Sequence, residues 1–373
     1  MGSAGGPQAR YGSGCGGLAA DGHGMALYRW PAIASSGESE RMTENITTMR
    51  AAVCVGAGGP EMLEIREVPV PAVREGWSLV KVRGAGLNRS ELRTRRGHSP
   101  SVRFPRVLGI ECVGTLAIST HSTLRDGARV AAVMGEMGRD FDGGYAEYAL
   151  LPNDLLMPIE TTLPWEVLAA LPETYLTAQG ALDMLGITPD HQGRLLIRGG
   201  TASVGLAAAS IAAGYGFDTA ATTRRPAKAD TLTKAGVDHV LLDHGEPLAD
   251  SLHDLWPEGP DYILDLIGTA TLVDSLRLVR RGGTVCMSGS LSGWLIPDFE
   301  PIAQIPSGTK LTAFHSDNYK GSAGAPLLQR VVHQIEAGRY RPNIDRVFTL
   351  DDIAAAHTYM ENNEATGKLV VLP

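Results

Sequence analysis

Residues 194–225 constrain the fold of this chain more than any other stretch. A short apolar run at 195–197 predicts a strand, and the small apolar residues at 206–213 suit a helix that lies flat on a sheet. Residues 219–223 predict a second strand. A strand, a glycine turn, a helix and a strand within about thirty residues form a βαβ unit, so we expect a parallel sheet here.

The turn of this unit reads Gly199-Gly200-Thr201-Ala202-Ser203-Val204-Gly205. Glycines let backbone N–H groups approach an anion closely, and the dipole of the following helix favours negative charge, so the turn suits a pyrophosphate. Its spacing departs from G-x-G-x-x-G, and the alternative is a helix start packed tightly on a strand with no ligand. The candidate contacts are Gly200, Thr201, Ala202, Ser203 and Val204.

The end of the second strand indicates which dinucleotide the turn would hold. NAD sites have an Asp or Glu about twenty residues on, where it binds the ribose 2′-hydroxyl. Here the chain has Thr222-Thr223-Arg224-Arg225, with Lys228 one turn later. Hydroxyl and guanidinium groups suit a phosphate instead. We therefore predict NADP(H), with Thr223, Arg224 and Lys228 around its 2′-phosphate.

Composition limits the other possibilities. With 373 residues, 43% of them hydrophobic and 20% charged, the chain is long enough for two well-filled domains. A net charge of −8 argues against a nucleic-acid or anionic-membrane surface, and no apolar run is long enough for a membrane helix. The four cysteines lie far apart, which is typical of the reducing cytoplasm and not of a disulfide framework or a zinc cluster.

Local patterns divide the chain into an extension and two domains. Residues 1–48, rich in Gly, Ala and Ser, predict a disordered N-terminal extension. Many short strands with Gly and Pro turns predict a β-rich domain from 49 to 165. Residues 166–319 predict a doubly wound parallel sheet of six strands. Residues 320–373 end as strand, helix and strand, so the α/β domain is predicted to be inserted within the β-rich one.

Ligands of doubly wound sheets bind outside the carboxyl ends of the strands. The strands predicted at 262–266, 284–288 and 310–315 each end in residues that could meet a ligand there. This rule adds Gly268, Ser288, Gly289, Phe314 and His315 to the candidate cofactor contacts.

Several motifs together resemble the medium-chain dehydrogenase/reductase superfamily, in particular its zinc-free quinone and enone reductases. The motifs, beside the glycine turn, are Gly86-Leu87-Asn88-Arg89-Ser90-Glu91, Leu108-Gly109-Ile110-Glu111-Cys112-Val113-Gly114, Gly143-Gly144-Tyr145-Ala146-Glu147-Tyr148, Thr177-Ala178 and Thr366-Gly367-Lys368. The resemblance implies a GroES-like substrate domain, an inserted Rossmann domain and an active site in the cleft between them. It adds Tyr175, Thr177 and Lys368 to the cofactor contacts, although Tyr175 may equally belong to the core.

Two departures from the zinc enzymes of this superfamily predict that no metal is bound. Those enzymes have a metal-binding Cys just after the segment that matches Leu87-Asn88, and a His where this chain has Ile110. Their four-Cys structural loop is also missing. Without thiolate or imidazole, a tetrahedral zinc site has lost its better ligands. Glu91, Glu111 and Cys112 could substitute, but a hydrogen-bonding or fold-stabilising role is favoured.

Without a Lewis acid, reduction of a quinone or an activated C=C bond is easier than oxidation of an alcohol. Asn88 would orient the ligand or stabilise its loop, and His98 would donate a proton or lie exposed in its loop. Ser99 stands where enoyl-thioester reductases of the superfamily have a Tyr, which argues against thioesters. The expected partners are a small quinone or enone and a second copy of the chain, paired through 310–315. The alternatives are a biosynthetic double-bond reductase of one metabolite and a non-catalytic NADPH-binding structural protein.

Overall fold

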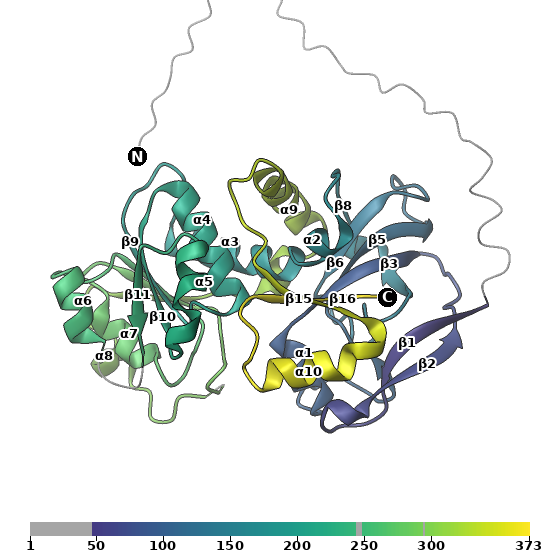
Figure 1. Cartoon of the computed structure of the whole chain (residues 1–373), viewed down its shortest axis with the longest axis horizontal. Helices are drawn as coiled ribbons and strands as arrows, with labels where there is room; N and C mark the ends of the chain where they lie inside the picture. The colour runs from purple at the N-terminus through teal and green to yellow at the C-terminus, as the bar shows by residue number, and fades with distance from the viewer. Residues whose placement is uncertain (1–46, 244–247, 294) are drawn as a thin grey trace, which may run out of the picture. The chain divides into compact units, whose positions relative to one another are not determined.

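In the computed structural model, which describes residues 47–243, 248–293 and 295–373, the βαβ unit is the centre of a six-stranded parallel sheet (Figure 1). The strand order is β11-β10-β9-β12-β13-β14, so the sheet is doubly wound, and its order reverses between β9 and β12. The strands are β9 (Arg194–Arg198), β10 (Asp218–Thr223), β11 (His239–Leu242), β12 (Tyr262–Asp265), β13 (Thr284–Met287) and β14 (Lys310–Ala313).

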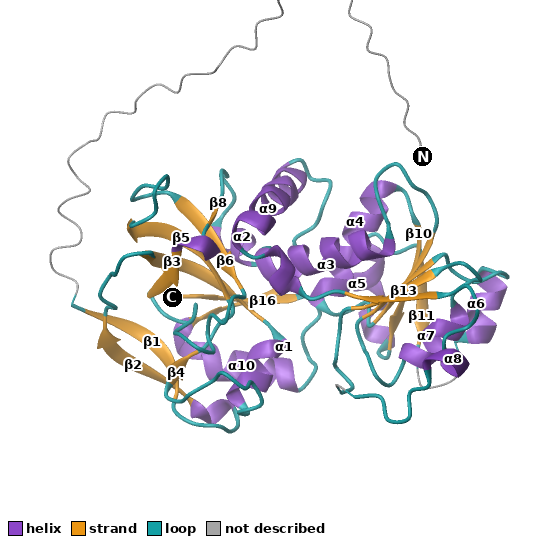
Figure 2. Ribbon diagram, turned by 180° about the vertical axis from the view of Figure 1, so that it is seen from behind, coloured by secondary structure: helices purple, strands orange, loops and turns teal. Residues whose placement is uncertain are grey.

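Helices cover both faces of this sheet because alternate strand residues point to opposite sides (Figure 2). Leu195 and Ile197 of β9 pack in one buried cluster with residues of α4 (Ser203–Tyr215). Leu196, between them, packs in another cluster with residues of α6 (Ala249–Leu255) and α7 (Leu272–Leu278). The remaining helices of this part are α5 (Ala229–Lys234) and α8 (Pro301–Gln304).

The β-rich part contains two sheets. β1 (Thr48–Cys54) lies between β2 (Leu63–Pro69) and β4 (Arg106–Val107). The larger sheet has the order β15-β16-β3-β5-β6-β8, and β7 also pairs with β3. Its strands are β3 (Trp77–Leu87), β5 (Glu111–Ile118), β6 (Arg129–Val133), β7 (Tyr148–Pro152), β8 (Met157–Pro158), β15 (Ile344–Thr349) and β16 (Lys368–Leu372).

The C-terminal strands therefore join the N-terminal sheet, as the inserted arrangement predicts: β16 runs antiparallel to β3, with Leu369 opposite Leu87. Residues 107–115, whose sequence predicts a strand interrupted by two glycines, contribute to β4 and β5. Gly109 explains the break, because its φ of +102° is a conformation that no strand contains. α1 (Arg89–Arg95) and α10 (Ile353–Glu361) pack beside these sheets.

Helix α3 (Pro172–Leu185) joins the two halves of the fold. It packs against α4, β13 and β14 on one side and against β5, β6 and α9 (Gly321–Glu336) on the other. The short α2 (Trp165–Ala169) precedes it. Pro172 starts α3, where its missing N–H costs nothing, and Gly186 ends it with a φ of +78°. Among the described helices, none is long and apolar enough to cross a membrane.

Candidate functional site

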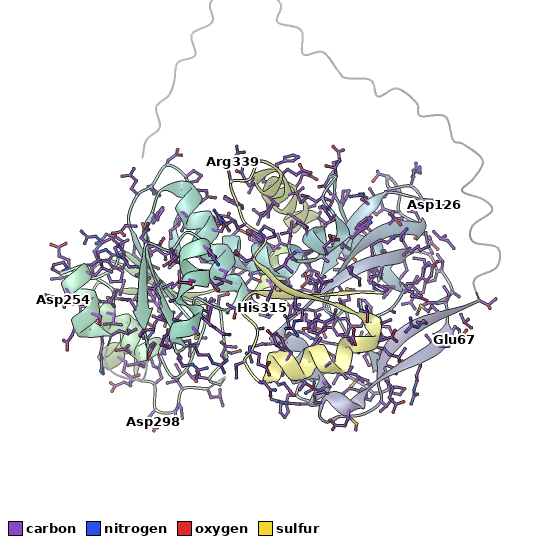
Figure 3. All side chains as sticks on the ribbon, in the orientation of Figure 1. Glu67, Asp126, Asp254, Asp298, His315 and Arg339 are labelled. Atoms are coloured by element: carbon purple, nitrogen blue, oxygen red, sulfur yellow. The ribbon has the colours of Figure 1, made fainter. Side chains whose placement is uncertain are left out.

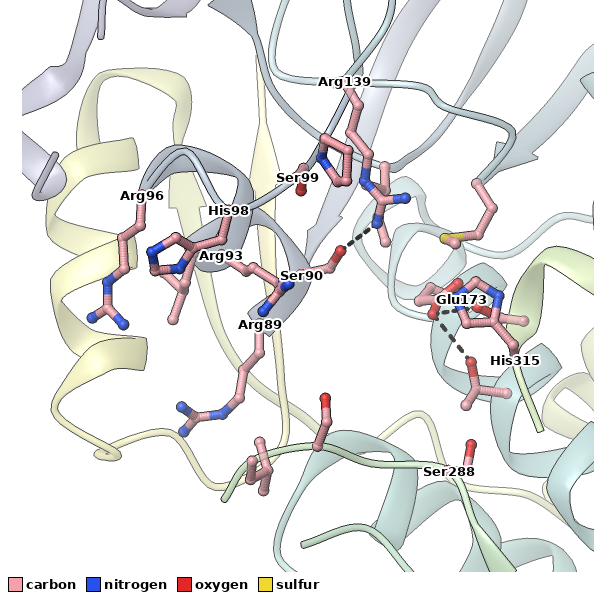
Figure 4. A pocket seen from close by; sticks show the side chains of 18 of the residues that line it. Arg89, Ser90, Arg93, Arg96, His98, Ser99, Arg139, Glu173, Ser288 and His315 are labelled. Carbon is pink, nitrogen blue, oxygen red and sulfur yellow. Dashed lines mark hydrogen bonds between the residues drawn. The ribbon is translucent and has the colours of Figure 1, made fainter. Parts of the chain in front are cut away.

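A cavity of about 720 Å³ lies beside the carboxyl ends of β13 and β14 (Figure 4). Its wall comes from α1 and the turn after it, from the loop at 134–139, from the first turns of α3 and from the segments that follow β13 and β14. Of the residues predicted from the sequence, Thr177, Ser288, Phe314, His315 and His98 line it.

Four of these five residues form one side of the cavity. Ser288 Oγ donates to the carbonyl of Phe314 at 3.2 Å, which ties the segment after β13 to that after β14. Phe314 is buried against α3, where a Cβ on Gly180 would lie 2.1 Å from its ring. His315, labelled in Figure 3, is exposed, and its Nδ1 accepts from the N–H of Asp317 at 3.3 Å.

Gly268 and Gly289 do not line the cavity but let two loops pack together. A Cβ on Gly268 would lie 2.7 Å from the carbonyl oxygen of Gly289, and one on Gly289 would lie 2.0 Å from that of Leu266. Gly268 also has a φ of +98°. Packing accounts for both glycines, and their contact with a cofactor remains a prediction.

The glycine turn has both features that the sequence analysis treated as alternatives. A Cβ on Gly205 would lie 2.6 Å from the carbonyl oxygen of Gly200, and one on Gly200 would lie 2.8 Å from Cβ of Ala221, so tight packing requires both glycines. At the same time, Ala202, the residue before α4, provides no side-chain cap, and the first turn of α4 has no acidic residue. Its first N–H groups are therefore available to an anion.

At the end of β10 the three predicted phosphate ligands differ. Lys228 Nζ donates to the carbonyls of Asn363 and Glu364, each at 3.1 Å, and of Ala365 at 2.6 Å. Its three hydrogens hold the loop before β16, so this placement does not support a phosphate-binding role. Thr223 is also buried, and its hydroxyl bonds to the backbone of Arg225.

Arg224 lies just after β10, and its role as a phosphate ligand remains a prediction. Its side chain is exposed. Within the described ranges 47–243, 248–293 and 295–373, no residue forms a hydrogen bond with this side chain. Burial, and then the nearby charge of Arg224, lower the pKa of Arg89. Two guanidinium groups that repel each other are stabilised when an anion binds between them.

Lys368 and Asn88 belong to a buried network and not to the cavity wall. Lys368 Nζ lies 2.6 Å from Glu111 Oε1, and both side chains are almost fully buried. The amide of Asn88 donates to Glu111 at 2.9 Å and accepts from Lys368 at 2.7 Å. Neither residue lines the cavity, and this network accounts for both side chains, while the cofactor role of Lys368 and the ligand-orienting role of Asn88 remain predictions.

Tyr175 also differs from its predicted role. It is fully buried, its hydroxyl donates to the carbonyl of Arg341, and its ring stacks on Tyr340 at 6.1 Å. The core placement, which the sequence left open, is the one observed. Burial raises the pKa of the Tyr175 hydroxyl.

Glu173 is the acid-base group that the sequence analysis missed. It lines the cavity, and its Oε1 accepts from Ser316 at 2.8 Å and from Thr177 at 3.2 Å. Its Oε2 is buried and has no hydrogen-bond partner among the described residues. Burial, and then the charge of Glu111, raise the pKa of Glu173 to about 7. The sequence feature that could have indicated Glu173 is the Pro-Glu pair at the start of the helix that carries Thr177.

His98 is exposed and lines the cavity opposite Glu173 (Figure 4). Ser99, next to it, is buried and bonds to Thr94 at 2.8 Å. Arg139 and Ser90, which the sequence analysis did not consider, bond to each other at 2.7 Å in the same wall.

No group of three metal-binding side chains lies together in the described part of the chain. Ile110 is buried in the wall, and burial raises the pKa of the Cys112 thiol to about 12, so it is no ready thiolate ligand.

Comparisons with known proteins agree with this architecture. Residues 74–161 match the family model of the alcohol dehydrogenase GroES-like domain, and residues 235–371 match that of zinc-binding dehydrogenase. The chain is 29% identical to a human quinone oxidoreductase over 87% of this chain and 98% of the relative. It is 26% identical to a chloroplastic NADPH-dependent alkenal/one oxidoreductase of Arabidopsis thaliana over 91% of this chain and 86% of the relative.

A mycobacterial protein solved in complex with NADPH has the same fold, with a TM-score of 0.78 at 24% identity, covering 87% of this chain and 100% of the other. The two parts of the fold and the cavity at the carboxyl ends of the strands define a class of two-domain dehydrogenases and reductases. The chain belongs to the medium-chain dehydrogenase/reductase superfamily, in its quinone oxidoreductase-like branch. It is thus a member of an oxidoreductase family.

Proposed function

We propose that this protein uses NADPH to reduce a quinone or an α,β-unsaturated carbonyl compound without a metal. The observation that carries the proposal is the position of Glu173, a carboxyl group with a raised pKa, in the cavity wall with Thr177, Ser288 and Phe314. The names of the human and Arabidopsis relatives, and the NADPH complex of the mycobacterial protein, support the reaction and the cofactor.

The residues at the carboxyl ends of the strands fit the cofactor. The first N–H groups of α4 would hold its pyrophosphate, because no side chain caps them. Arg224 would hold the 2′-phosphate, assisted by Arg89. Thr177, Ser288 and the backbone near His315 would meet the nicotinamide end. When bound, NADPH supplies the hydride that adds to the β-carbon of an enone or to a quinone.

Glu173 would supply the proton that completes the reduction. Its oxygens lie beside the hydroxyls of Thr177 and Ser316, which can pass a proton into the cavity. A carboxyl group whose pKa is about 7 is protonated in a large fraction of molecules at neutral pH, and it can be reprotonated from solvent. His98, across the cavity, remains the second candidate donor, as the sequence predicts.

The test is a stereochemical one, on the full chain after dialysis against a strong chelator. NADPH deuterated at C4 on either face is incubated with a neutral enone, and the product is analysed by NMR. We expect label at the β-carbon from one face only, with turnover unaffected by the chelator. Oxidation of simple alcohols with NADP⁺, with no reduction of enones or quinones, would show that the reaction class is different.

A further inference from the structure

The cavity wall carries more positive charge than a neutral quinone or enone requires. Besides Arg89, which would assist the 2′-phosphate, the described residues that line it include three arginines, Arg93, Arg96 and Arg139, against two glutamates, Glu136 and Glu173. The whole chain has a net charge of −8, so cations are not abundant on it generally. A concave wall of one sign concentrates ligands of the opposite sign.

These charges lie away from the residues that would meet the nicotinamide. Figure 4 shows Arg93, Arg96 and His98 on one side of the cavity, Glu173, Ser288 and His315 on the other, and Arg139 with Ser90 between them. A ligand that reacts beside Glu173 would therefore extend past Arg139 toward the arginines of α1.

Arg139 is the arginine in this wall whose hydrogen bonds are incomplete. Its side chain is 17% exposed, and one terminal nitrogen donates to Ser90 Oγ at 2.7 Å. Its charged neighbour, Glu136, lies 3.6 Å away, is half exposed and also accepts from the hydroxyl of Ser101. Its Nε is buried and has no hydrogen-bond partner among the described residues.

The other terminal nitrogen of Arg139 forms no hydrogen bond with a described residue, because Glu136 lies 3.6 Å from it, so its N–H groups can donate to a ligand oxygen in the cavity. The planar edge of a guanidinium group binds two oxygens of one carboxylate or phosphate. Arg96 is less suited to direct contact, because it already pairs with Glu361 at 2.7 Å and points to solvent. Its charge, with that of Arg93, would add a favourable field.

Resting on the proposed function, we infer that the substrate is an unsaturated carbonyl compound that also carries an anionic oxygen group, and that Arg139 with Ser90 binds this group. The anion is a carboxylate or a phosphate ester, since both present the paired oxygens that the guanidinium edge recognises. Arg139 is thus a specificity-determining residue that binds substrate, and it takes no part in hydride or proton transfer. This favours a reductase of one metabolite class over a general quinone reductase.

The test compares pairs of substrates in which one member carries the anionic group and the other is its neutral ester or alcohol, on the full chain with saturating NADPH. Trans-4-oxo-2-pentenoate is paired with its neutral methyl ester, and a phosphate monoester of a hydroxy-enone is paired with its free alcohol. We expect kcat/KM for the anionic member of at least one pair to exceed that of its neutral partner about tenfold or more, mainly through KM. The pair that shows the preference distinguishes carboxylate from phosphate.

Variants locate the preference. Arg139→Gln should lower kcat/KM for the anionic substrate about tenfold or more and change that for the neutral partner less than about twofold. Arg139→Lys should retain part of the preference, because the charge remains but the planar edge is lost. Arg103→Gln, which removes an exposed arginine outside the cavity wall, is the matched control and should change neither value.

A binding measurement separates this inference from the chemistry. Calorimetric titration of 4-oxopentanoate, a saturated keto acid that cannot be reduced at a double bond, should show binding to the native chain and not to Arg139→Gln. Equal kcat/KM for charged and neutral partners in both pairs would overturn the inference and leave the proposed function intact. Failure of every enone and of a neutral quinone to oxidise NADPH would overturn the proposed function, and this inference with it.

Discussion

Arg224 is the residue on which cofactor choice depends. It is exposed at the end of β10, where its charge adds to the lowering of the pKa of Arg89. We expect Arg224→Ala to weaken NADPH binding by on the order of 1.5–3 kcal/mol, as for a charge-assisted hydrogen bond, and to leave NADH binding almost unchanged. Titration calorimetry measures both.

Arg281→Ala is the matched control for that substitution, because Arg281 is exposed and precedes β13, at the amino end of the strands. It should alter neither affinity. If the native chain bound NADH as tightly as NADPH, the assignment of Arg224 to a 2′-phosphate would fail.

Glu173 predicts the pH dependence of turnover. An acid that donates a proton must be protonated, so turnover should fall as pH rises through about 7, where burial and the charge of Glu111 place the pKa of Glu173. Glu173→Gln should have lower turnover and lose this dependence, whereas Glu160→Gln, an exposed residue outside the cavity wall, should behave as the native chain. A falling limb that persists in Glu173→Gln would assign the proton to another donor, such as His98.

The same shift has a consequence for folding stability. The pKa of Glu173 is about 7 in the folded chain against an ordinary value of 4.5, so between these values the folded state binds the extra proton. Its contribution is then fully present below about pH 4.5 and is lost as pH rises through about 7. Urea unfolding should show a smaller loss of stability over this range for Glu173→Gln than for the native chain, because Gln does not titrate. Other titrating groups, such as His357, are common to both chains and cancel in the comparison.

At the scale of elements, hydrogen bonds at both ends of α1 hold its residues in position. Asn88 and Glu91 form a capping box at its start, and Glu91 also accepts from the N–H of Ile110 at 3.0 Å. At its other end, Arg95 is fully buried and bonds to His357 of α10 at 3.0 Å. α1 is therefore fixed at both ends, so its outward-facing Ser90 and Arg93 are presented to the cavity from a rigid support.

The sequence indicated the existence of most elements better than their extent. The helix predicted at 206–213, for example, is α4 (Ser203–Tyr215). Local periodicity and turn residues determine such elements. α3 begins at Pro172, so Glu173 lies on the same helix as Thr177, and no sequence motif singled out Glu173.

At the scale of the whole molecule, we expect a homodimer. β14 (Lys310–Ala313) is the edge of the six-stranded sheet, and exposed strand edges pair with further strands. The backbone N–H groups of Lys310 and Phe314 donate toward β13, so by the alternation of a strand that of Ala313 points to the open edge. Light scattering should give about 79 kDa, twice the 39.5 kDa of one chain.

Ala313→Pro should convert that dimer into a monomer, because it removes an N–H at the open edge without removing one that bonds to β13. Ala313→Ser keeps the N–H and should remain a dimer. A native chain that scatters as 39.5 kDa at micromolar concentration would contradict the expectation.

The sequence by itself determined the superfamily, the six-stranded parallel sheet and the glycine turn. These features depend on residues close together in the chain, because strand and helix periods and turn residues are local. It also indicated which residues end the strands, and Thr177, Ser288, Phe314 and His315 do meet in one cavity wall.

Only the tertiary structure decided the hydrogen-bond partners and burial of the polar groups. Lys368 and Glu111 are 257 residues apart in the chain, and Lys228 and Ala365 are 137 apart, yet each pair bonds directly. Glu173, on α3, owes its raised pKa to burial and to a second carboxylate, Glu111, which lies on β5. The ionisation and availability of a side chain depend on the solvent and charges around it, and packing brings those together from distant parts of the chain.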